Sequence, residues 1–265
     1  MSTPARNPTS HPAPHPGAPP FATLVLMRHG ESRWNAEDRF AGWVDVGLTE
    51  RGQRQATAHG RRLAATGFRA GAVHTSLLAR AASTARLAVE AAGWRVTIRS
   101  TWRLNERHYG SLQGRRRQDV RAEVGEEQVT QWRRSPLASP PPATPEDTLQ
   151  RAVVDQHRGF GIRVPSSESL TELAERLRPY RDLALLPALR RHRHVLVVSH
   201  GNTLRALLED LDPHHGVLPE IAPGASLRLR LDEDLRPLRS AAHLAGAIAA
   251  PPTPSGAPSR TDTPP

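Results

Sequence analysis

Two short, mainly apolar runs in this chain are each followed by histidine and glycine, and this repetition limits the folds it can adopt. The run 23–27 precedes His29, and the run 195–198 precedes His200. Apolar runs of this length between polar turns are typical of buried strands. Because helical segments separate the two runs, we expect parallel strands of one sheet. Both histidines then lie beyond its carboxyl edge, where α/β proteins bind ligands.

Other segments have the periodicity or the capping residues of regular elements. Helices are predicted at 49–67, 78–92, 203–211 and from a Ser169–Glu172 capping box onward. Strands are predicted at 70–75, at 95–99 and, as a half-exposed edge strand, at 227–231. This order of elements predicts an α/β fold, a three-layer sandwich with a mainly parallel central sheet flanked by helices.

The two ends of the chain differ in composition from the rest. Residues 1–20 and 249–265 are rich in proline and alanine, which predicts disordered tails around one domain at 21–248. Within that domain, the segment 135–165 contains six prolines. We expect a long, irregular, lid-like loop there.

Composition excludes several classes of protein. The 265 residues include no cysteine, which excludes a disulfide scaffold, a thiolate metal site and a cysteine nucleophile. No apolar run reaches the roughly 18 residues of a membrane span, and no secretory signal is expected, so we expect a cytoplasmic protein. The net charge is +10 and all 36 basic side chains are arginine, which suits anionic partners. Nucleic acid is not expected, because the basic run 115–117 has no aromatic residues interleaved with it.

The residues that follow the two strands also predict a functional site. One histidine at a strand end is more often a turn residue, but two of them with Arg28 attached favour a functional site. Two imidazoles and a guanidinium at one sheet edge would form a positive pocket that suits a phosphoryl group. A neutral imidazole can attack phosphorus while cations stabilise the equatorial oxygens.

Six dispersed segments resemble the cofactor-dependent phosphoglycerate mutases of the histidine phosphatase superfamily. In family order these segments are 26–35, 39–49, 75–81, 104–114, 127–134 and 200–206. The resemblance covers about residues 22–240. The segment 104–114 is the most specific, because the wider phosphatase family lacks it in this form.

The resemblance implies an isomerase of glycolysis and gluconeogenesis. Members interconvert 3-phosphoglycerate and 2-phosphoglycerate through a phosphohistidine, primed by 2,3-bisphosphoglycerate, without a metal and as homodimers or homotetramers. The implied catalytic residues are His29 as nucleophile, Glu106 as general acid and base, and Arg28, Arg80 and His200 around the phosphoryl group. The implied substrate contacts are Asn35, Ala41, Gly42, Tyr109, Arg117, Arg133, Arg134, Gly201 and Asn202.

The chain departs from the family pattern at several positions. Arg117 replaces a lysine, Ala41 replaces a hydroxyl residue, and the segment 150–161 is unfamiliar. These differences affect substrate affinity and closure of the site more than the phosphohistidine chemistry. The alternative is therefore a phosphatase of the same superfamily that acts on a small phosphorylated metabolite.

Overall fold

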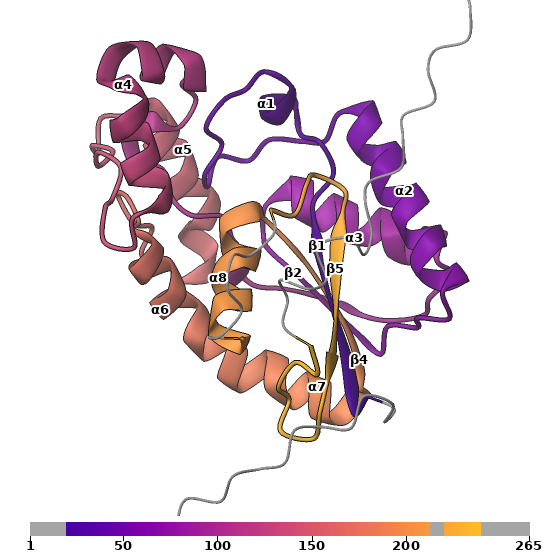
Figure 1. Ribbon diagram of the computed structural model, residues 1–265. Coiled ribbons are helices and arrows are strands. Elements are labelled where there is room, and N and C mark those ends of the chain that lie inside the picture. The colour runs from indigo at the N-terminus through magenta and orange to yellow at the C-terminus, as the bar shows by residue number, and fades with distance from the viewer. Residues whose placement is uncertain (1–19, 213–219, 240–265) are drawn as a thin grey trace, which may run out of the picture.

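The computed structural model describes residues 20–212 and 220–239, and within them five strands form one mixed sheet (Figure 1). The strands are β1 (Ala22–Arg28), β2 (Ala72–Thr75), β3 (Ile98–Ser100), β4 (His194–Ser199) and β5 (Ser226–Leu231). Their order is β3-β2-β4-β1-β5, with β5 antiparallel to β1 and the other neighbours parallel. The predicted mainly parallel sheet is confirmed, and the edge strand lies where the sequence indicated it.

Helices cover both faces of this sheet. The helices of the described residues are α1 (Arg33–Ala36), α2 (Glu50–Ala65), α3 (Ala79–Ala91), α4 (Arg117–Arg134), α5 (Thr148–His157), α6 (Leu170–Tyr180), α7 (Leu186–His192) and α8 (Gly201–Leu211). Short 3₁₀ turns lie at Trp102–Leu104, Gly110–Leu112 and Arg158–Phe160, and a π turn joins α6 to α7 at Arg181–Leu185. Figure 1 shows α2 and α3 on one side of the sheet and α6, α7 and α8 on the other.

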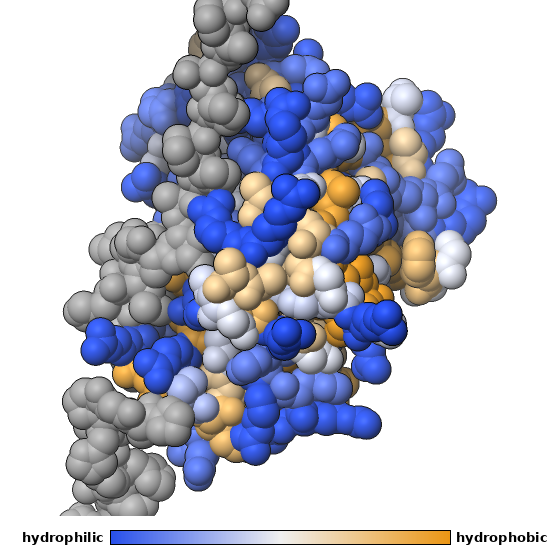
Figure 2. Space-filling model, turned by 90° about the vertical axis from the view of Figure 1, so that its right-hand side faces the viewer, coloured by the Kyte–Doolittle hydropathy of each residue, from blue (hydrophilic) through white to orange (hydrophobic). Residues whose placement is uncertain are grey.

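The central strand β1 supplies side chains to both layers. Val25 and Met27 pack against α2 and α3, whereas Leu24 and Leu26 pack against α6, α7 and α8. Burial on both faces explains why the strand reads as a continuous apolar run rather than an alternating one. Most hydrophobic side chains are thus buried in the core, and the face shown in Figure 2 is mainly hydrophilic. No helix in the described ranges is both long and apolar enough to cross a membrane.

Local capping explains where the predicted helices begin. The Thr49 hydroxyl accepts a hydrogen bond from the Gly52 N–H at 3.0 Å, and α2 starts at the next residue. Ser169 and Glu172 form the predicted reciprocal capping box at the start of α6. Helix α3 also agrees with its prediction, whereas the third strand lies at Ile98–Ser100 instead of 95–99.

The segment 135–165 is only in part the irregular loop that its prolines indicated. It contains α5 and a 3₁₀ turn, because the prolines lie before residue 146 and at 165, and none lies within α5. Buried Val153 and His157 hold α5 against the body: the Asn105 amide donates to His157 Nε2 at 3.0 Å. The tails predicted at 1–20 and 249–265 lie outside the described residues, apart from Pro20, as does the end of the predicted domain.

Two buried histidines, His59 and His74, make the stability of the fold depend on pH. Burial lowers the pKa values of His59 and His74 from 6.5 to about 4. The unfolded chain therefore binds more protons than the native protein between pH 6.5 and 4, and the free energy of unfolding falls as the pH falls through that range. Each histidine contributes up to about 3 kcal/mol to this loss.

We therefore expect His74→Gln to reduce the pH dependence of stability. Urea unfolding of the parent and the variant at pH 7.5, 5.5 and 4.5 measures it, and the difference between the two proteins should narrow as the pH falls. A difference in the free energy of unfolding that stays constant over the whole pH range would contradict this expectation. It would mean that folding does not change the protonation of His74 in this range.

Candidate active site

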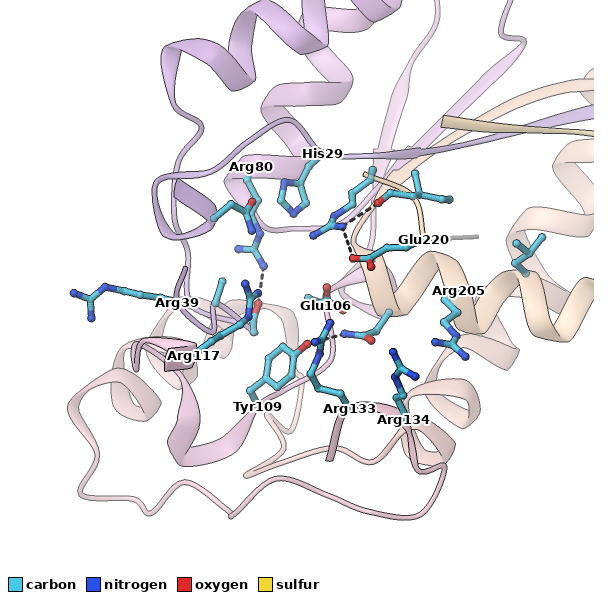
Figure 3. A pocket seen from close by; sticks show the side chains of 18 residues that line it. His29, Arg39, Arg80, Glu106, Tyr109, Arg117, Arg133, Arg134, Arg205 and Glu220 are labelled. Carbon is cyan, nitrogen blue, oxygen red and sulfur yellow. Dashed lines mark hydrogen bonds and ion pairs between the residues drawn. The ribbon is translucent and has the colours of Figure 1, made fainter. Parts of the chain in front are cut away.

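A strongly cationic cavity of about 380 Å³ opens at the carboxyl edge of the sheet (Figure 3). Its lining includes seven arginines and two glutamates. These charged residues are Arg28, Arg39, Arg80, Arg117, Arg133, Arg134, Arg205, Glu106 and Glu220. Such an excess of fixed positive charge in a concave site attracts small anions with more than one negative group.

His29 follows β1 and is directed into this cavity (Figure 3). Its Nδ1 is 2.7 Å from the carbonyl oxygen of Gly30, so Nδ1 carries the proton and Nε2 keeps a free lone pair. Burial, and then the charges of Arg80 and Arg28, hold the pKa of His29 well below its usual range. The ring is therefore neutral at pH 7, the state in which an imidazole can act as a nucleophile.

His200 lies beside His29 because β1 and β4 are parallel neighbours with aligned ends. The two ring centroids are 5.0 Å apart. Nε2 of His200 lies 2.8 Å from the Ser76 hydroxyl, whereas its buried Nδ1 has no hydrogen-bond partner in the described part of the chain. Burial, then Arg80 and His29, keep the pKa of His200 well below 6.5.

Arg28 and Arg80 flank the histidines and are held by backbone carbonyl groups. Arg80 donates to the carbonyls of Gly42 at 2.7 Å and Val44 at 3.0 Å. Arg28 donates to the carbonyl of Ile221 at 2.9 Å. Burial lowers the pKa of Arg80 to about 10, so it remains charged at pH 7. The Glu220 carboxylate also lies 3.5 Å from Arg28, but it is largely exposed. The carbonyl groups fix the two guanidinium groups and carry no net charge, so both can still bind an anion.

Glu106 and Tyr109 line the cavity on the loop that precedes α4. The Arg107 backbone N–H donates to Glu106 Oε1 at 2.8 Å, which fixes the carboxylate. The Asn202 amide donates to the Tyr109 hydroxyl at 2.8 Å. Burial raises the pKa of Tyr109, which therefore stays protonated at neutral pH.

Helix α4 brings three arginines to the cavity from its two ends. Arg117 is its first residue and pairs with Asp38 at 2.6 Å. Arg133 and Arg134 are its last two residues and lie across the cavity from His29 (Figure 3). The site therefore has two separated groups of cations, which fits a ligand with a negative group at each end.

The structure brings the predicted residues together from across the chain. Thirteen of the fourteen line the cavity, and the exception, His200, lies against His29. Asn35 also caps α1, since its side chain accepts a hydrogen bond from the Ser32 N–H at 3.1 Å.

Several lining residues were missed by the sequence analysis: Arg39, Arg205, Leu208, Glu220 and Ile221. A helical signal existed for Arg205 and Leu208, because they follow Gly201 at spacings of four and seven on α8. Glu220 and Ile221 had no such signal. They approach Arg28 from about 190 residues away, and the Glu220 carboxylate lies 3.5 Å from its guanidinium.

Comparisons with known proteins agree with this geometry. The model of the histidine phosphatase superfamily (branch 1) matches residues 24–237. A 2,3-bisphosphoglycerate-dependent phosphoglycerate mutase of a Nocardioides species is 42% identical over 223 residues, which cover 81% of this chain and 89% of that protein. The enzyme of the same name from Nocardia farcinica is 44% identical over 229 residues, covering 84% and 91%.

Solved structures with the same fold include phosphatases. A mycobacterial glucosyl-3-phosphoglycerate phosphatase superimposes with a TM-score of 0.61 at 25% identity, covering 78% of this chain and 92% of that one. Bacillus stearothermophilus YhfR gives a TM-score of 0.59 at 25% identity, covering 80% and 92%. The chain therefore belongs to the histidine phosphatase superfamily, and within it to the family of the 2,3-bisphosphoglycerate-dependent phosphoglycerate mutases.

Proposed function

We propose that this protein interconverts 3-phosphoglycerate and 2-phosphoglycerate through a phosphohistidine at His29. One observation carries the proposal: a neutral imidazole with a free Nε2 faces a cavity that has arginines on both sides. The substrates carry a phosphate and a carboxylate, and the two groups of cations match these two ends. The reaction belongs to glycolysis and gluconeogenesis, and we propose the cytoplasm as its compartment and a homodimer or homotetramer as its assembly.

At the phosphoryl end, Nε2 of His29 attacks phosphorus. The bond from phosphorus to the substrate oxygen breaks, and that oxygen leaves as a hydroxyl group after it takes up a proton. Arg28 and Arg80 stabilise the negative charge that spreads over the equatorial oxygens. Both are already fixed by carbonyl groups, so they need little rearrangement during the transfer. His200 donates a further hydrogen bond from Nδ1 to the same oxygens.

At the middle of the substrate, Glu106 accepts the proton of the reacting hydroxyl and returns it in the reverse direction. The hydroxyl that attacks the phosphorylated His29 must lose a proton, and the hydroxyl that forms in the reverse direction must gain one. The carboxylate of Glu106 faces the cavity and is fixed by the Arg107 N–H, as a general acid and base requires.

At the far end, arginines hold the remaining anionic groups. Arg133 and Arg134 oppose His29, and Arg117 enters from the other end of α4. The Asn202 amide and the Tyr109 hydroxyl, which are hydrogen-bonded to each other, add polar groups to the cavity wall. We propose that Asn35, Gly42, Gly201 and the methyl side chain of Ala41 complete the substrate contacts.

We propose that the same cavity holds 2,3-bisphosphoglycerate as the priming cofactor. Its extra phosphate requires more cationic partners than one phosphoglycerate does, and the lining offers seven arginines. Arg28 Nε is also buried without a partner among the described residues, which leaves a donor for an anion. When bound, the cofactor supplies the phosphoryl group that His29 carries.

A phosphatase is the second candidate, because solved structures that share this fold are named as phosphatases. In that case water attacks the phosphorylated His29 in place of the substrate hydroxyl. The mutase and the phosphatase reactions use the same residues to phosphorylate His29. They differ in the group that then attacks the phosphorylated histidine, a substrate hydroxyl or water.

Phosphorus-31 NMR with 3-phosphoglycerate distinguishes the two reactions. We expect a 2-phosphoglycerate resonance that grows only when catalytic 2,3-bisphosphoglycerate is added, with little release of inorganic phosphate. The His29→Gln variant is the matched control for contaminating activity. Growth of inorganic phosphate alone would replace the mutase assignment with the phosphatase one.

A further inference from the structure

We propose that Ser76 is a positioning residue that selects the tautomer of His200 with its proton on Nδ1. Ser76 follows β2 and is fully buried, like His200. Its hydroxyl lies 2.8 Å from His200 Nε2, across 124 residues of sequence. The inference rests on the proposed function, because it assigns His200 a task in phosphoryl transfer.

The hydrogen bonds of the Ser76 hydroxyl determine its direction. Its oxygen accepts a hydrogen bond from the Leu78 N–H at 3.2 Å. The hydroxyl proton then has His200 Nε2 as its acceptor. In the opposite arrangement the oxygen would accept twice, and its own proton would have no acceptor among residues 20–212 and 220–239. Buried polar hydrogens are rarely left unbonded, so the hydroxyl donates to Nε2.

A neutral imidazole that accepts at Nε2 carries its proton on Nδ1. Nδ1 of His200 is buried and is the ring nitrogen that has no partner in the part of the chain described. The His29 ring lies 5.0 Å away, centroid to centroid. We infer that a phosphoryl group on His29 places oxygens beside this N–H donor, which no residue of the described ranges uses.

The other neutral tautomer of His200, with its proton on Nε2, would disfavour phosphoryl transfer. Nδ1 would then present a lone pair to negatively charged oxygens and repel them. A doubly protonated ring would also supply the donor, but burial and the Arg80 charge disfavour it, since they lower the pKa of His200 well below 6.5. Selection of the tautomer by a neutral hydroxyl is the remaining way to give Nδ1 a proton.

The two histidines are thus prepared for opposite tasks by different partners. A backbone carbonyl takes the Nδ1 proton of His29 and leaves Nε2 as a nucleophile. A side-chain hydroxyl donates to Nε2 of His200 and leaves Nδ1 as a donor. Because a carbonyl can only accept, whereas a hydroxyl can also donate, this chemistry requires a hydroxyl at position 76.

The tautomer can be read without substrate, by long-range proton–nitrogen NMR on protein labelled with nitrogen-15 histidine. Comparison with His200→Gln assigns the His200 signals. We expect Nδ1 protonated and Nε2 bare in the parent and in Ser76→Thr, which keeps the hydroxyl. Ser76→Ala should move the proton to Nε2 or populate both forms. A proton on Nε2 in the parent, or an unchanged tautomer in Ser76→Ala, would overturn the proposal.

Kinetics supply the second readout. In metal sites, removal of a group that orients a histidine ligand typically costs about 10- to 100-fold, and we expect a loss of the same order here. We expect Ser76→Ala to lower kcat by that factor with KM for 3-phosphoglycerate within about threefold, and Ser76→Thr to recover most of the loss. The matched control is Ser226→Ala, which removes a buried hydroxyl 2.9 Å from Nε2 of His59, outside the cavity. Its kcat should match the parent.

The two readouts separate the inference from the proposed function. If the tautomer behaves as expected but no 2-phosphoglycerate forms, the role of Ser76 holds and the reaction must be reassigned. If mutase activity is present and Ser76→Ala has the parental kcat and tautomer, the role of Ser76 is wrong. If Ser76→Ala does not fold, the parent and Ser76→Thr spectra still decide the tautomer.

Discussion

Replacing His29 by glutamine should abolish turnover, with a loss of at least about 10⁴-fold in kcat. Glutamine keeps a hydrogen-bonding side chain but has no lone pair on nitrogen that can attack phosphorus. The same change should abolish transfer of phosphorus-32 from labelled 2,3-bisphosphoglycerate to the protein. In the parent, the label should be lost in acid, as expected for a phosphoryl group on nitrogen.

A matched control separates loss of the nucleophile from loss of a buried histidine. His74 is 3% exposed, as His29 is, and its Nδ1 lies 2.9 Å from the Tyr180 hydroxyl, away from the cavity. We expect His74→Gln to be less stable but to be labelled and to turn over like the parent. Labelling of His29→Gln at the parental level would show that another residue carries the phosphoryl group.

The strands and the sheet edge were predictable because their signals are local. The middle of a strand buried on both faces must be apolar, as it is at 24–27 in β1 and at 195–198 in β4. Once these two strands are parallel neighbours, their ends fix the places of His29 and His200. The start of α6 was predictable for the same reason, since Ser169 and Glu172 satisfy each other's backbone within one turn.

Features that depend on distant contacts were not predictable from the chain alone. Composition suggested a loop at 135–165, but the helix α5 forms there because His157 binds Asn105 and its ring lies 4.9 Å from that of Trp43. The carbonyl of Ile221 that fixes Arg28 likewise has no signature in sequence. The family resemblance identified Glu106 as a candidate catalytic residue. It did not indicate which residues hold the loop that contains Glu106.

A buried ion pair holds that loop. Arg176 and Glu168 meet through two hydrogen bonds, at 2.6 and 3.0 Å, and their side chains are 6% and 5% exposed. Arg176 also donates to the carbonyls of Asn105 and Glu106, and Glu168 accepts from the His108 N–H at 2.8 Å. The pair therefore fixes the backbone on both sides of the Glu106 carboxylate.

Glu168→Gln should destabilise the fold by about 3–5 kcal/mol, because it leaves the Arg176 charge buried without a counter-charge. Urea unfolding at pH 7.5 measures the loss. The matched control is Glu90→Gln, which breaks the exposed pair of Arg86 and Glu90 at 3.1 Å and should leave the free energy of unfolding nearly unchanged.

The effect on catalysis should follow from the loop rather than from general loss of structure. At a temperature where Glu168→Gln is fully folded, kcat should still be lower than in the parent, because Glu106 is no longer held beside the reacting hydroxyl. Labelling of His29 by 2,3-bisphosphoglycerate should suffer less, since Arg28, Arg80 and His200 lie outside this loop. A stability change as small as that of Glu90→Gln would mean that the carbonyl groups alone hold Arg176. The carboxylate of Glu168 would then be dispensable for the geometry of the site.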